Sequence, residues 1–274
     1  MYFCRKYIRM RFSVITINYN NCEGLHQTVN SVLGQSYSDF EYIIIDGGST
    51  DGSVDILKEY SDKIQYWVSE PDNGIYHAMN KGVAHAHGEY CIFMNSGDCL
   101  YSQTVLERVD AENPVEDVVV GKVSIDKQGN IISPPPKGEL TMYHLYSGSI
   151  PHQGSFIKTD LLRKFPYDEN LKISSDWKFF VQILIVNNGS IRYLDEFVAI
   201  YDTDGLSSNN PKLMRKEKED VMSALFPQRI IADYQIMKES ECLTQSLTPL
   251  LRQHYRVDKF LYRFGKLLLS LINK

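Results

Sequence analysis

Three aspartates follow apolar runs in the first hundred residues, where their carboxylates could act on a nucleotide. Asp46 ends the run "YIII", Asp72 follows "IQYWVSEP", and Asp98 ends "CIFMNSGD". A single carboxylate at such a place can simply close a turn or cap the next helix. Three of them suit a nucleoside diphosphate, because one can accept hydrogen bonds from a base or ribose while another holds a divalent cation against the phosphates.

The pattern around these acids predicts a sheet that brings them to one edge. β-rich runs begin at Phe12, Tyr42, Ile64 and Glu89, and helical patterns separate them. Such alternation predicts crossover units and a mostly parallel sheet with helices on both faces. Open sheets of this kind bind ligands outside the carboxyl ends of their strands. We therefore expect an α/β fold with its acids gathered along that edge.

The alternation weakens after Asp98, which indicates a second, smaller half. Strand-like segments at 117–125 and 190–202 predict a mixed sheet packed onto the first, and 175–186 has a helical pattern. From about Pro211 the pattern is helical to the end of the sequence. We expect a domain over residues 1–210, made of halves 1–100 and 101–210, followed by a helical extension over 211–274.

Composition excludes several classes of protein. Hydrophobic residues make up 43% and charged residues 23%, as in an ordinary globular chain, and the formal charge of -5 argues against a nucleic-acid partner. The five cysteines are odd in number and lack close pairing, so we expect reduced thiols, neither a disulfide framework nor a zinc site. The sequence shows no signal peptide and no apolar stretch near the roughly 20 residues of a membrane span. We expect a cytoplasmic protein.

The common phosphate-binding loops are missing from the sequence. It contains neither GxxxxGK[ST] nor GxGxxG; "DGGSTDGS" is Gly-rich, but its acid precedes the glycines and no lysine follows. The acids at the strand ends are then the remaining candidates for handling a diphosphate.

Four segments together resemble bacterial family 2 glycosyltransferases of the GT-A fold, of the polysaccharide biosynthesis type. They are "SVITINYN", "EYIIIDGGSTDGS", "SEPDNGIYHAMNKGVAHAHGEYCIFMNSGD" and "PHQGSFIKTDLLRKFPYDENLKISSDWKFF". The resemblance runs from about Phe12 to Ser208. It implies an inverting transferase that uses Mn²⁺ or Mg²⁺ and moves a sugar from a nucleotide-diphosphate donor, in our expectation a UDP-sugar. The acceptor would be a hydroxyl of a glycan or of a lipid-linked glycan. Residues 1–100 would bind the donor, and 101–210 the metal and acceptor.

The resemblance also implies roles for individual residues. Asp98 is the expected metal ligand, His152 a second candidate ligand, and Asp176 the general base. Two positions depart from the family: Asn95 stands where many relatives have another acid, which leaves fewer anionic ligands, and His77 where relatives often have Asp, which alters sugar choice. Asp202 lies in a segment that resembles a family loop near the donor, although turn chemistry also explains it. The expected donor contacts are Thr16, Asn18, Tyr19, Asp46, Asp72, Asn80, Lys81, Asn95 and Ser96.

Asp176 also has suitable chemistry on its own. A base must accept the proton of the acceptor hydroxyl as that oxygen attacks the anomeric carbon opposite the leaving diphosphate. Asp176 begins an apolar helical pattern, so it could instead be an N-terminal cap; a helix start in either case favours the ionised carboxylate. The neighbouring Trp177 could stack on a sugar or fill the core. His152 has a similar alternative, as a packed loop residue.

The last residues of the sequence are basic and amphipathic. Residues 252–274 hold six Lys or Arg against one acid, a net +5 that leaves -10 on the rest. Apolar residues Phe260 and Phe264 alternate at helical spacing with the cationic residues, which suits a helix lying on an anionic bilayer surface. The alternative is a terminal helix that covers the domain or pairs with a second copy. The cationic residues recur at spacings of three and four on another face of that helix: Arg256, Lys259, Arg263 and Lys266.

Two other functions compete with glycosyl transfer. A nucleotidyltransferase would need a basic Gly-rich segment near the N-terminus, and "TINYNNCEG" has no Lys or Arg. A non-catalytic nucleotide- or glycan-binding module is favoured by Asn95 and His77, and it predicts nucleotide binding without turnover of any donor.

Overall fold

The computed structural model describes residues 10–126, 128–132, 138–203, 210–253, 262–266 and 268–269. The chain divides into two compact units, Met1–Val221 and Met222–Lys274. The domain boundary that we expect at residue 210 stays a prediction. Some residues considered above lie outside the described part: Cys4, Arg256, Lys259, Phe260 and Ser208.

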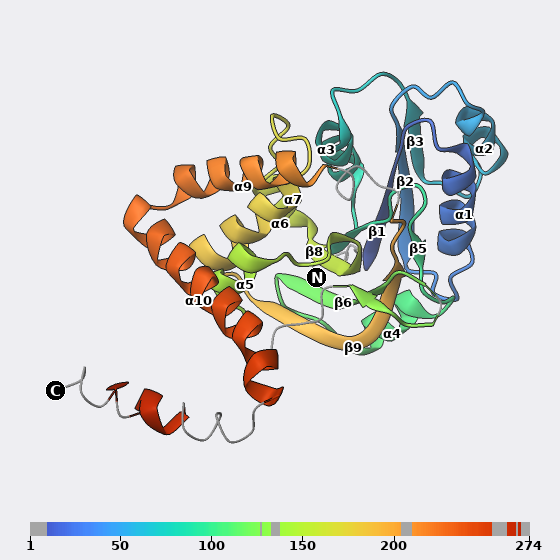
Figure 1. Cartoon of the computed structure of the whole chain (residues 1–274). Helices are drawn as coiled ribbons and strands as arrows, with labels where there is room; N and C mark the ends of the chain where they lie inside the picture. Colours follow the sequence, from blue (N-terminus) through green and yellow to red (C-terminus); the bar gives the residue numbers. More distant parts are fainter. Residues whose placement is uncertain are drawn as a thin grey trace, which may run out of the picture. The chain divides into compact units, whose positions relative to one another are not determined.

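The first half of the chain forms the predicted parallel strands. Their order is β3-β2-β1-β4, with β1 at Phe12–Asn18, β2 at Phe40–Asp46, β3 at Tyr66–Ser69 and β4 at Tyr90–Phe93 (Figure 1). Three helices make the crossovers: α1 (Cys22–Leu33), α2 (Ser53–Glu59) and α3 (Ile75–His85). The register pairs Asn18 with Asp46 and Asp46 with Ser69, so the carboxyl ends of three strands are level.

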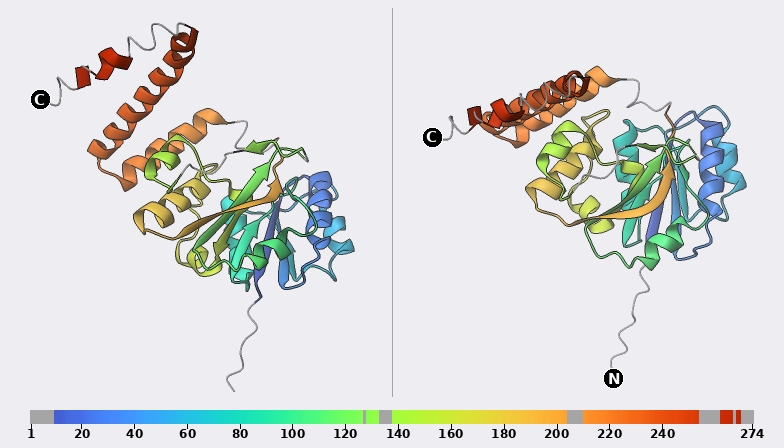
Figure 2. Two further views of the ribbon diagram at one scale, coloured as in Figure 1. Left: turned by 90° about the horizontal axis from the view of Figure 1, so that it is seen from below. Right: turned by 60° about the horizontal axis from the view of Figure 1, so that its bottom comes forward.

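The second half extends the same sheet with mixed pairing. From β4 the order continues β8-β6-β9-β5; β8 is antiparallel to both β4 and β6, whereas β9 runs parallel beside β6 (Figure 2). The predicted α/β sheet with a mixed second half and a helical C-terminal part is confirmed. The elements are β5 (Cys99–Leu100), α4 (Val105–Ala111), β6 (Val118–Ser124), β7 (Ile131–Ile132), α5 (Met142–Ser147), β8 (Ser155–Lys158), α6 (Thr159–Lys164), α7 (Ser175–Phe180) and β9 (Ile191–Ile200).

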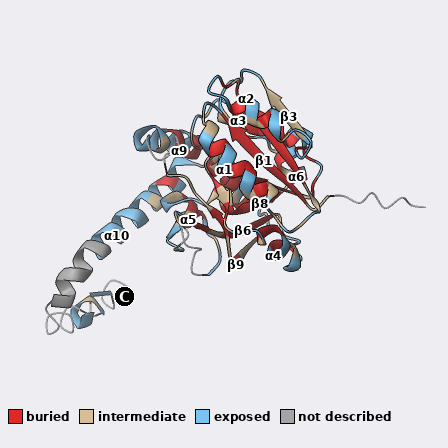
Figure 3. Cartoon of the chain, turned by 90° about the vertical axis from the view of Figure 1, so that its right-hand side faces the viewer, coloured by how far each residue is buried: buried red, intermediate tan, exposed pale blue. Residues whose placement is uncertain are grey.

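Alternate residues of the strands face opposite helical layers, as the twofold strand period requires. Phe12 and Val14 of β1 belong to the core that includes buried residues of α1 and α2, and the strands are buried on both faces (Figure 3). On the other face α3 crosses so close to β1 that a Cβ at Gly82 would lie 2.5 Å from Cγ2 of Ile15. Gly82 therefore sets how near α3, which carries predicted site residues, lies to the sheet.

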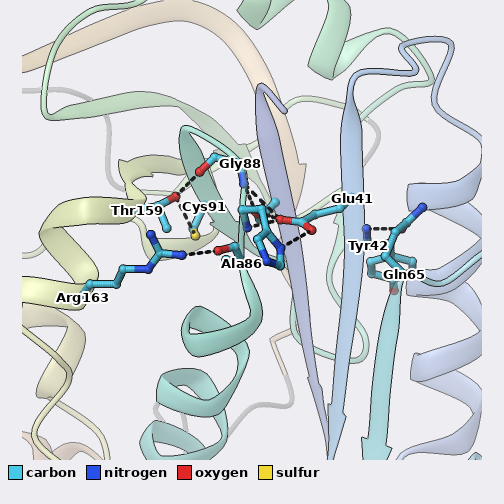
Figure 4. A network of polar contacts seen from close by, with 10 residues as sticks. Glu41, Tyr42, Gln65, Ala86, Gly88, Cys91, Thr159 and Arg163 are labelled. Carbon is cyan, nitrogen blue, oxygen red and sulfur yellow. Dashed lines mark hydrogen bonds and ion pairs between the residues drawn. The ribbon is translucent and has the colours of Figure 1, made fainter. Parts of the chain in front are cut away.

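A buried polar network ties the amino ends of the strands (Figure 4). Glu41 accepts hydrogen bonds from the Ser13 hydroxyl at 2.6 Å and from the Gly88 amide at 3.0 Å. Thr159 at the start of α6 donates to the Gly88 carbonyl at 2.6 Å. This network holds the turn between α3 and β4 at the edge opposite the predicted site.

Two helices follow β9: α9 (Pro211–Leu225) and, in the second unit, α10 (Gln228–Gln253). Across the described residues, no helix is both long enough and apolar enough to cross a membrane.

Candidate active site

The first part of the site lies where β1, β2 and β3 end. Asp46 is buried, and its carboxylate accepts hydrogen bonds from Asn18 Nδ2 at 2.7 Å, the Ser49 hydroxyl at 2.6 Å and the Ser69 hydroxyl at 2.5 Å. Burial opposes ionisation, but these hydrogen bonds prevail and hold the pKa of Asp46 below its usual value. Asp46 is thus an ionised anchor for the strand ends, and a nucleotide base would have to share its acceptor sites with these donors.

Tyr19 and Asp72 meet above Gly47, directly after β2. A Cβ at Gly47 would lie 2.8 Å from Asp72 Oδ2 and 3.1 Å from Tyr19 Cδ2. The Tyr19 residue is 67% exposed. An exposed ring can stack on a base, and a carboxylate beside it can accept hydrogen bonds from the N–H groups of that base. Thr16, by contrast, is buried within β1 and bonds to the Tyr42 hydroxyl at 2.9 Å.

The two predicted donor contacts on α3 bind different segments of the chain. The Lys81 ammonium pairs with Glu70, next to the loop that carries Asp72. The Asn80 side chain is taken by the segment that leads to α7: it donates to the Tyr167 carbonyl at 2.9 Å and accepts from the Tyr167 amide at 3.0 Å. Lys81 thus lies near the loop of Asp72, a predicted donor contact, whereas Asn80 binds the backbone of the segment that leads to Asp176.

The turn Asn95–Asp98 follows β4 and is held by α1. Gly97 has a φ of +105°, which favours glycine. The Thr28 hydroxyl accepts from the Gly97 amide at 3.0 Å and donates to the Asp98 carbonyl at 2.7 Å, and Asn21 donates to the Ser96 carbonyl at 3.0 Å. Sequence reasoning missed Thr28; the available signal was one polar residue on the apolar stripe of an amphipathic helix.

Asp98 lies beside Asp202, which follows β9. Asp98 is 3% exposed, and its Oδ1 accepts the Asp202 amide at 2.9 Å. Burial, with the added effect of the Asp202 charge, raises the pKa of Asp98 to about 7. A Cβ at Gly97 would lie 2.3 Å from Asp202 Oδ2, so a second carboxylate approaches the turn from β9.

These residues fit a hard divalent cation that is coordinated partly by the protein and partly by the oxygens of a diphosphate. Among the described residues, no three or more His, Cys, Asp or Glu side chains form a group that could hold a metal ion. Mg²⁺ in nucleotide sites, however, needs only one or two carboxylates together with phosphate oxygens and water. The buried Oδ1 atoms of Asn18 and Asn95 have no hydrogen-bond partner, and such orphan oxygens at the strand ends suit a cation or a ligand donor. Asp98 is the residue that would hold the ion.

Asp176 lies in the first turn of α7, in contact with α3. Its Oδ1 accepts a hydrogen bond from the Tyr76 hydroxyl at 2.9 Å. Trp177 is buried and donates its indole N–H to the Leu145 carbonyl at 2.8 Å. The core-filling alternative for Trp177 is therefore confirmed, and no sugar can stack on its buried face.

His152 is buried in an aromatic cluster. Its ring stacks on Phe93 with centroids 4.8 Å apart, and Nε2 shares a hydrogen bond of 2.8 Å with the Tyr167 hydroxyl. Burial lowers the pKa of His152, which favours the neutral ring. To ligate a metal through Nε2 the ring would have to give up this hydrogen bond, so metal coordination by His152 stays a prediction.

His77, in α3, accepts a hydrogen bond at 3.3 Å from the amide of Asn73, which lies in the loop after Asp72.

Comparison with known proteins identifies the family. Residues 13–162 match the model described as glycosyl transferase family 2. An uncharacterised glycosyltransferase of Mycobacterium tuberculosis is 34% identical over 208 residues, which cover 72% of this chain and 77% of that protein. A PGL/p-HBAD biosynthesis glycosyltransferase of Mycobacterium bovis is 31% identical over 206 residues, which cover 72% and 79%.

Solved structures show the same fold at lower identity. S. aureus TarS 1–349 in complex with UDP-GlcNAc has a TM-score of 0.61 and 20% identity, covering 78% of this chain and 66% of that one. The mannosyltransferase PcManGT from Pyrobaculum calidifontis, in complex with GDP-Man and Mn²⁺, has a TM-score of 0.57 and 15% identity, covering 76% and 61%. With the family match over more than half of the sequence and these relatives, the chain is a glycosyltransferase that belongs to glycosyl transferase family 2.

Proposed function

We propose that this glycosyltransferase moves one sugar, with inversion, from a UDP-sugar to a hydroxyl of a glycan or lipid-linked acceptor in cell-surface polysaccharide synthesis. The observation that carries the proposal is the gathering of polar side chains at the ends of neighbouring strands. Asn18, Asp46 and Ser69 end β1, β2 and β3 at one level, and the Asn95–Asp98 turn follows β4 next to β1. Such an edge is where open α/β sheets bind nucleotides.

Each group has a distinct part in the proposed reaction. Tyr19 stacks on the base, Asp72 accepts its hydrogen bonds, and Lys81 lies near the diphosphate. Asp98 would hold Mn²⁺ or Mg²⁺, and the cation would supply charge stabilisation for the leaving nucleoside diphosphate. Asp176 accepts the proton of the acceptor hydroxyl as the oxygen attacks the anomeric carbon, so the new bond forms as the bond to the diphosphate breaks.

A donor screen tests this function without requiring the acceptor. We expect a UDP-sugar to raise the melting temperature when Mn²⁺ is present, because a ligand at 100 times its Kd stabilises the folded state by about 2.7 kcal/mol. UDP-, GDP-, dTDP- and CMP-sugars are compared with and without EDTA, and release of UDP is then measured with a pool of glycan acceptors. Neighbours of the same fold bind UDP-GlcNAc or GDP-Man. Preference for a GDP-sugar, or no response to any donor, would contradict the proposal.

We further propose that residues 252–274 bring the enzyme to an anionic membrane surface at the cytoplasmic face, where a lipid-linked acceptor would be found. The support is the net charge of +5 in this segment, together with exposed aromatic residues next to its cations. Tyr262 and Phe264, in the described part of the segment, are both largely exposed. A basic residue near an anionic surface contributes about 1 kcal/mol to binding.

Charge removal in the full chain tests the membrane proposal. We expect the wild type to cosediment with phosphatidylglycerol vesicles at low salt, and a variant with Gln at 256, 259, 263 and 266 to lose most of that binding. Four other exposed lysines serve as a matched control that should bind as wild type does: Lys58, Lys63, Lys164 and Lys212 are replaced by Gln. Equal binding by the tail variant, or equal binding to neutral phosphatidylcholine vesicles, would refute an electrostatic surface contact.

A further inference from the structure

We propose that Tyr76 is a positioning residue for the general base: its hydroxyl holds the carboxylate of Asp176 in one orientation. The inference rests on the proposed function, in which Asp176 takes the proton of the acceptor. Tyr76 lies on α3, the helix that also carries the predicted donor contacts Asn80 and Lys81, yet its hydroxyl would act on the residue that deprotonates the acceptor.

The contact between Tyr76 and Asp176 joins two helix starts that are 100 positions apart in the sequence. Tyr76 lies in the first turn of α3 and Asp176 in the first turn of α7, and the hydroxyl lies 2.9 Å from Oδ1. Tyr76 is 5% exposed, and its ring packs against Tyr167 with centroids 5.8 Å apart. A ring packed in this way can point its hydroxyl in only one direction, so the position of the hydroxyl is fixed before substrate binds.

The chemistry of the pair makes Tyr76 the donor. Burial, together with the negative charge of Asp176, raises the pKa of Tyr76 well above its usual value, so the phenol keeps its proton. A hydrogen bond from a neutral phenol to a carboxylate is charge-assisted, and it is stronger than a hydrogen bond between two neutral groups. Among the described residues, no other side chain donates a hydrogen bond to this carboxylate. The bond engages Oδ1, and Oδ2 is then the oxygen that can accept the proton.

A second contact from α3 fixes the backbone that leads to Asp176. Asn80 lies one helical turn after Tyr76, on the same face of α3. Its amide bonds to both the carbonyl and the N–H of Tyr167, at 2.9 and 3.0 Å, and donates to Glu169 at 2.8 Å. Asn80, whose contact with the donor stays a prediction, thus also fixes the backbone that leads to Asp176.

A buried acid of α9 holds the other side of this segment. Glu217 accepts the backbone N–H groups of Lys172 at 2.7 Å, Ile173 at 3.1 Å and Ser174 at 2.9 Å, directly before α7. Glu217 and Asn80 fix the backbone, and the side chain of Asp176 can then still rotate. The hydrogen bond from the Tyr76 hydroxyl fixes that rotation.

The test is Tyr76→Phe in the full-length enzyme, which removes one oxygen and keeps the ring. We expect kcat to fall roughly 10- to 100-fold, the range for a lost hydrogen bond to a charged group, while KM and Kd for the donor stay within about twofold. The matched control is Tyr90→Phe: Tyr90 is also buried, and its hydroxyl donates to the Glu116 carbonyl at 2.8 Å at the far end of β4. This control should lose stability and keep kcat.

A kcat of Tyr76→Phe equal to that of the wild type, or an equal loss of kcat in Tyr90→Phe, would overturn the inference. A second measurement needs no turnover and separates this inference from the proposed function. Tyr76→Phe should raise the unfolding equilibrium constant roughly tenfold in the wild type but less than threefold in the Asp176→Ala background. Equal effects in both backgrounds would show that the two side chains are not coupled. A wild type that transfers no sugar, yet shows the coupling, would contradict the proposed function and leave the contact established.

Discussion

Replacing Asp176 by Asn should lower the rate of sugar transfer by roughly 10²- to 10⁴-fold, the contribution of a positioned general base. The amide cannot take the proton of the acceptor hydroxyl. Its oxygen can still accept the hydrogen bond that Tyr76 donates at 2.9 Å, so the geometry of α7 is kept. Donor affinity should remain within about twofold, because no predicted donor contact involves this side chain. The measurements are kcat at saturating donor and Kd from titration.

The control for this variant is Asp168→Asn in the same segment. Asp168 pairs with Lys178 at 2.6 Å, and this ion pair lowers its pKa. Its loss should reduce stability modestly and leave kcat within a few-fold of wild type, since Asp168 has no part in the proposed reaction. If Asp176→Asn lost donor binding but kept turnover, the assignment of the base would be wrong.

Replacing Asp98 by Asn should abolish the response of the enzyme to Mn²⁺. The amide removes the anionic ligand, so we expect kcat/KM to fall by roughly 10²- to 10³-fold, because the cation no longer stabilises the leaving diphosphate. In the metal-free protein the fold should be retained, since the Asn oxygen can still accept the Asp202 amide and a buried charge is removed. Melting temperatures with and without Mn²⁺, in the presence of UDP, measure the effect.

The matched control for Asp98 is Asp117→Asn. Asp117 is a partly buried acid directly before β6, and it accepts a hydrogen bond from the Ser190 amide at 2.8 Å, directly before β9. That variant should be less stable than wild type but should keep the full Mn²⁺ response. An equal Mn²⁺ shift in Asp98→Asn and wild type would mean that the metal binds elsewhere, and the metal assignment would have to be abandoned.

The parallel half of the sheet could be read from the sequence because its signals are local. Each strand is a β-rich run, each helix has its own apolar stripe, and the order of the units makes the sheet parallel. Positions at strand ends follow from the same signals, which is why Asp46 and the Asn95–Asp98 turn were predicted at neighbouring places. β8 was not predicted, because its four residues carry a weak pattern and become a strand through pairing with β4 and β6.

The contacts that orient the candidate site could not be predicted from the sequence. Thr28 lies 70 positions from Asp98, and Tyr76 lies 100 from Asp176. These pairs come into contact only when the helices pack on the sheet, and no spacing in the sequence predicts them. For the same reason the hydrogen bond from the Asn80 amide to the Tyr167 carbonyl, 87 positions away, could not be predicted.

Glu217 has a consequence for how small an active fragment of this enzyme can be. Strand pairing ends with β9 at Ile200, and the boundary expected from the sequence falls at residue 210. A fragment cut there would lose the carboxylate that three consecutive backbone N–H groups share before α7. Ser174 is the buried member of the three, and a buried donor without an acceptor costs about 1–3 kcal/mol. We therefore expect the smallest unit that keeps Asp176 in place to extend into α9, beyond the last strand of the sheet.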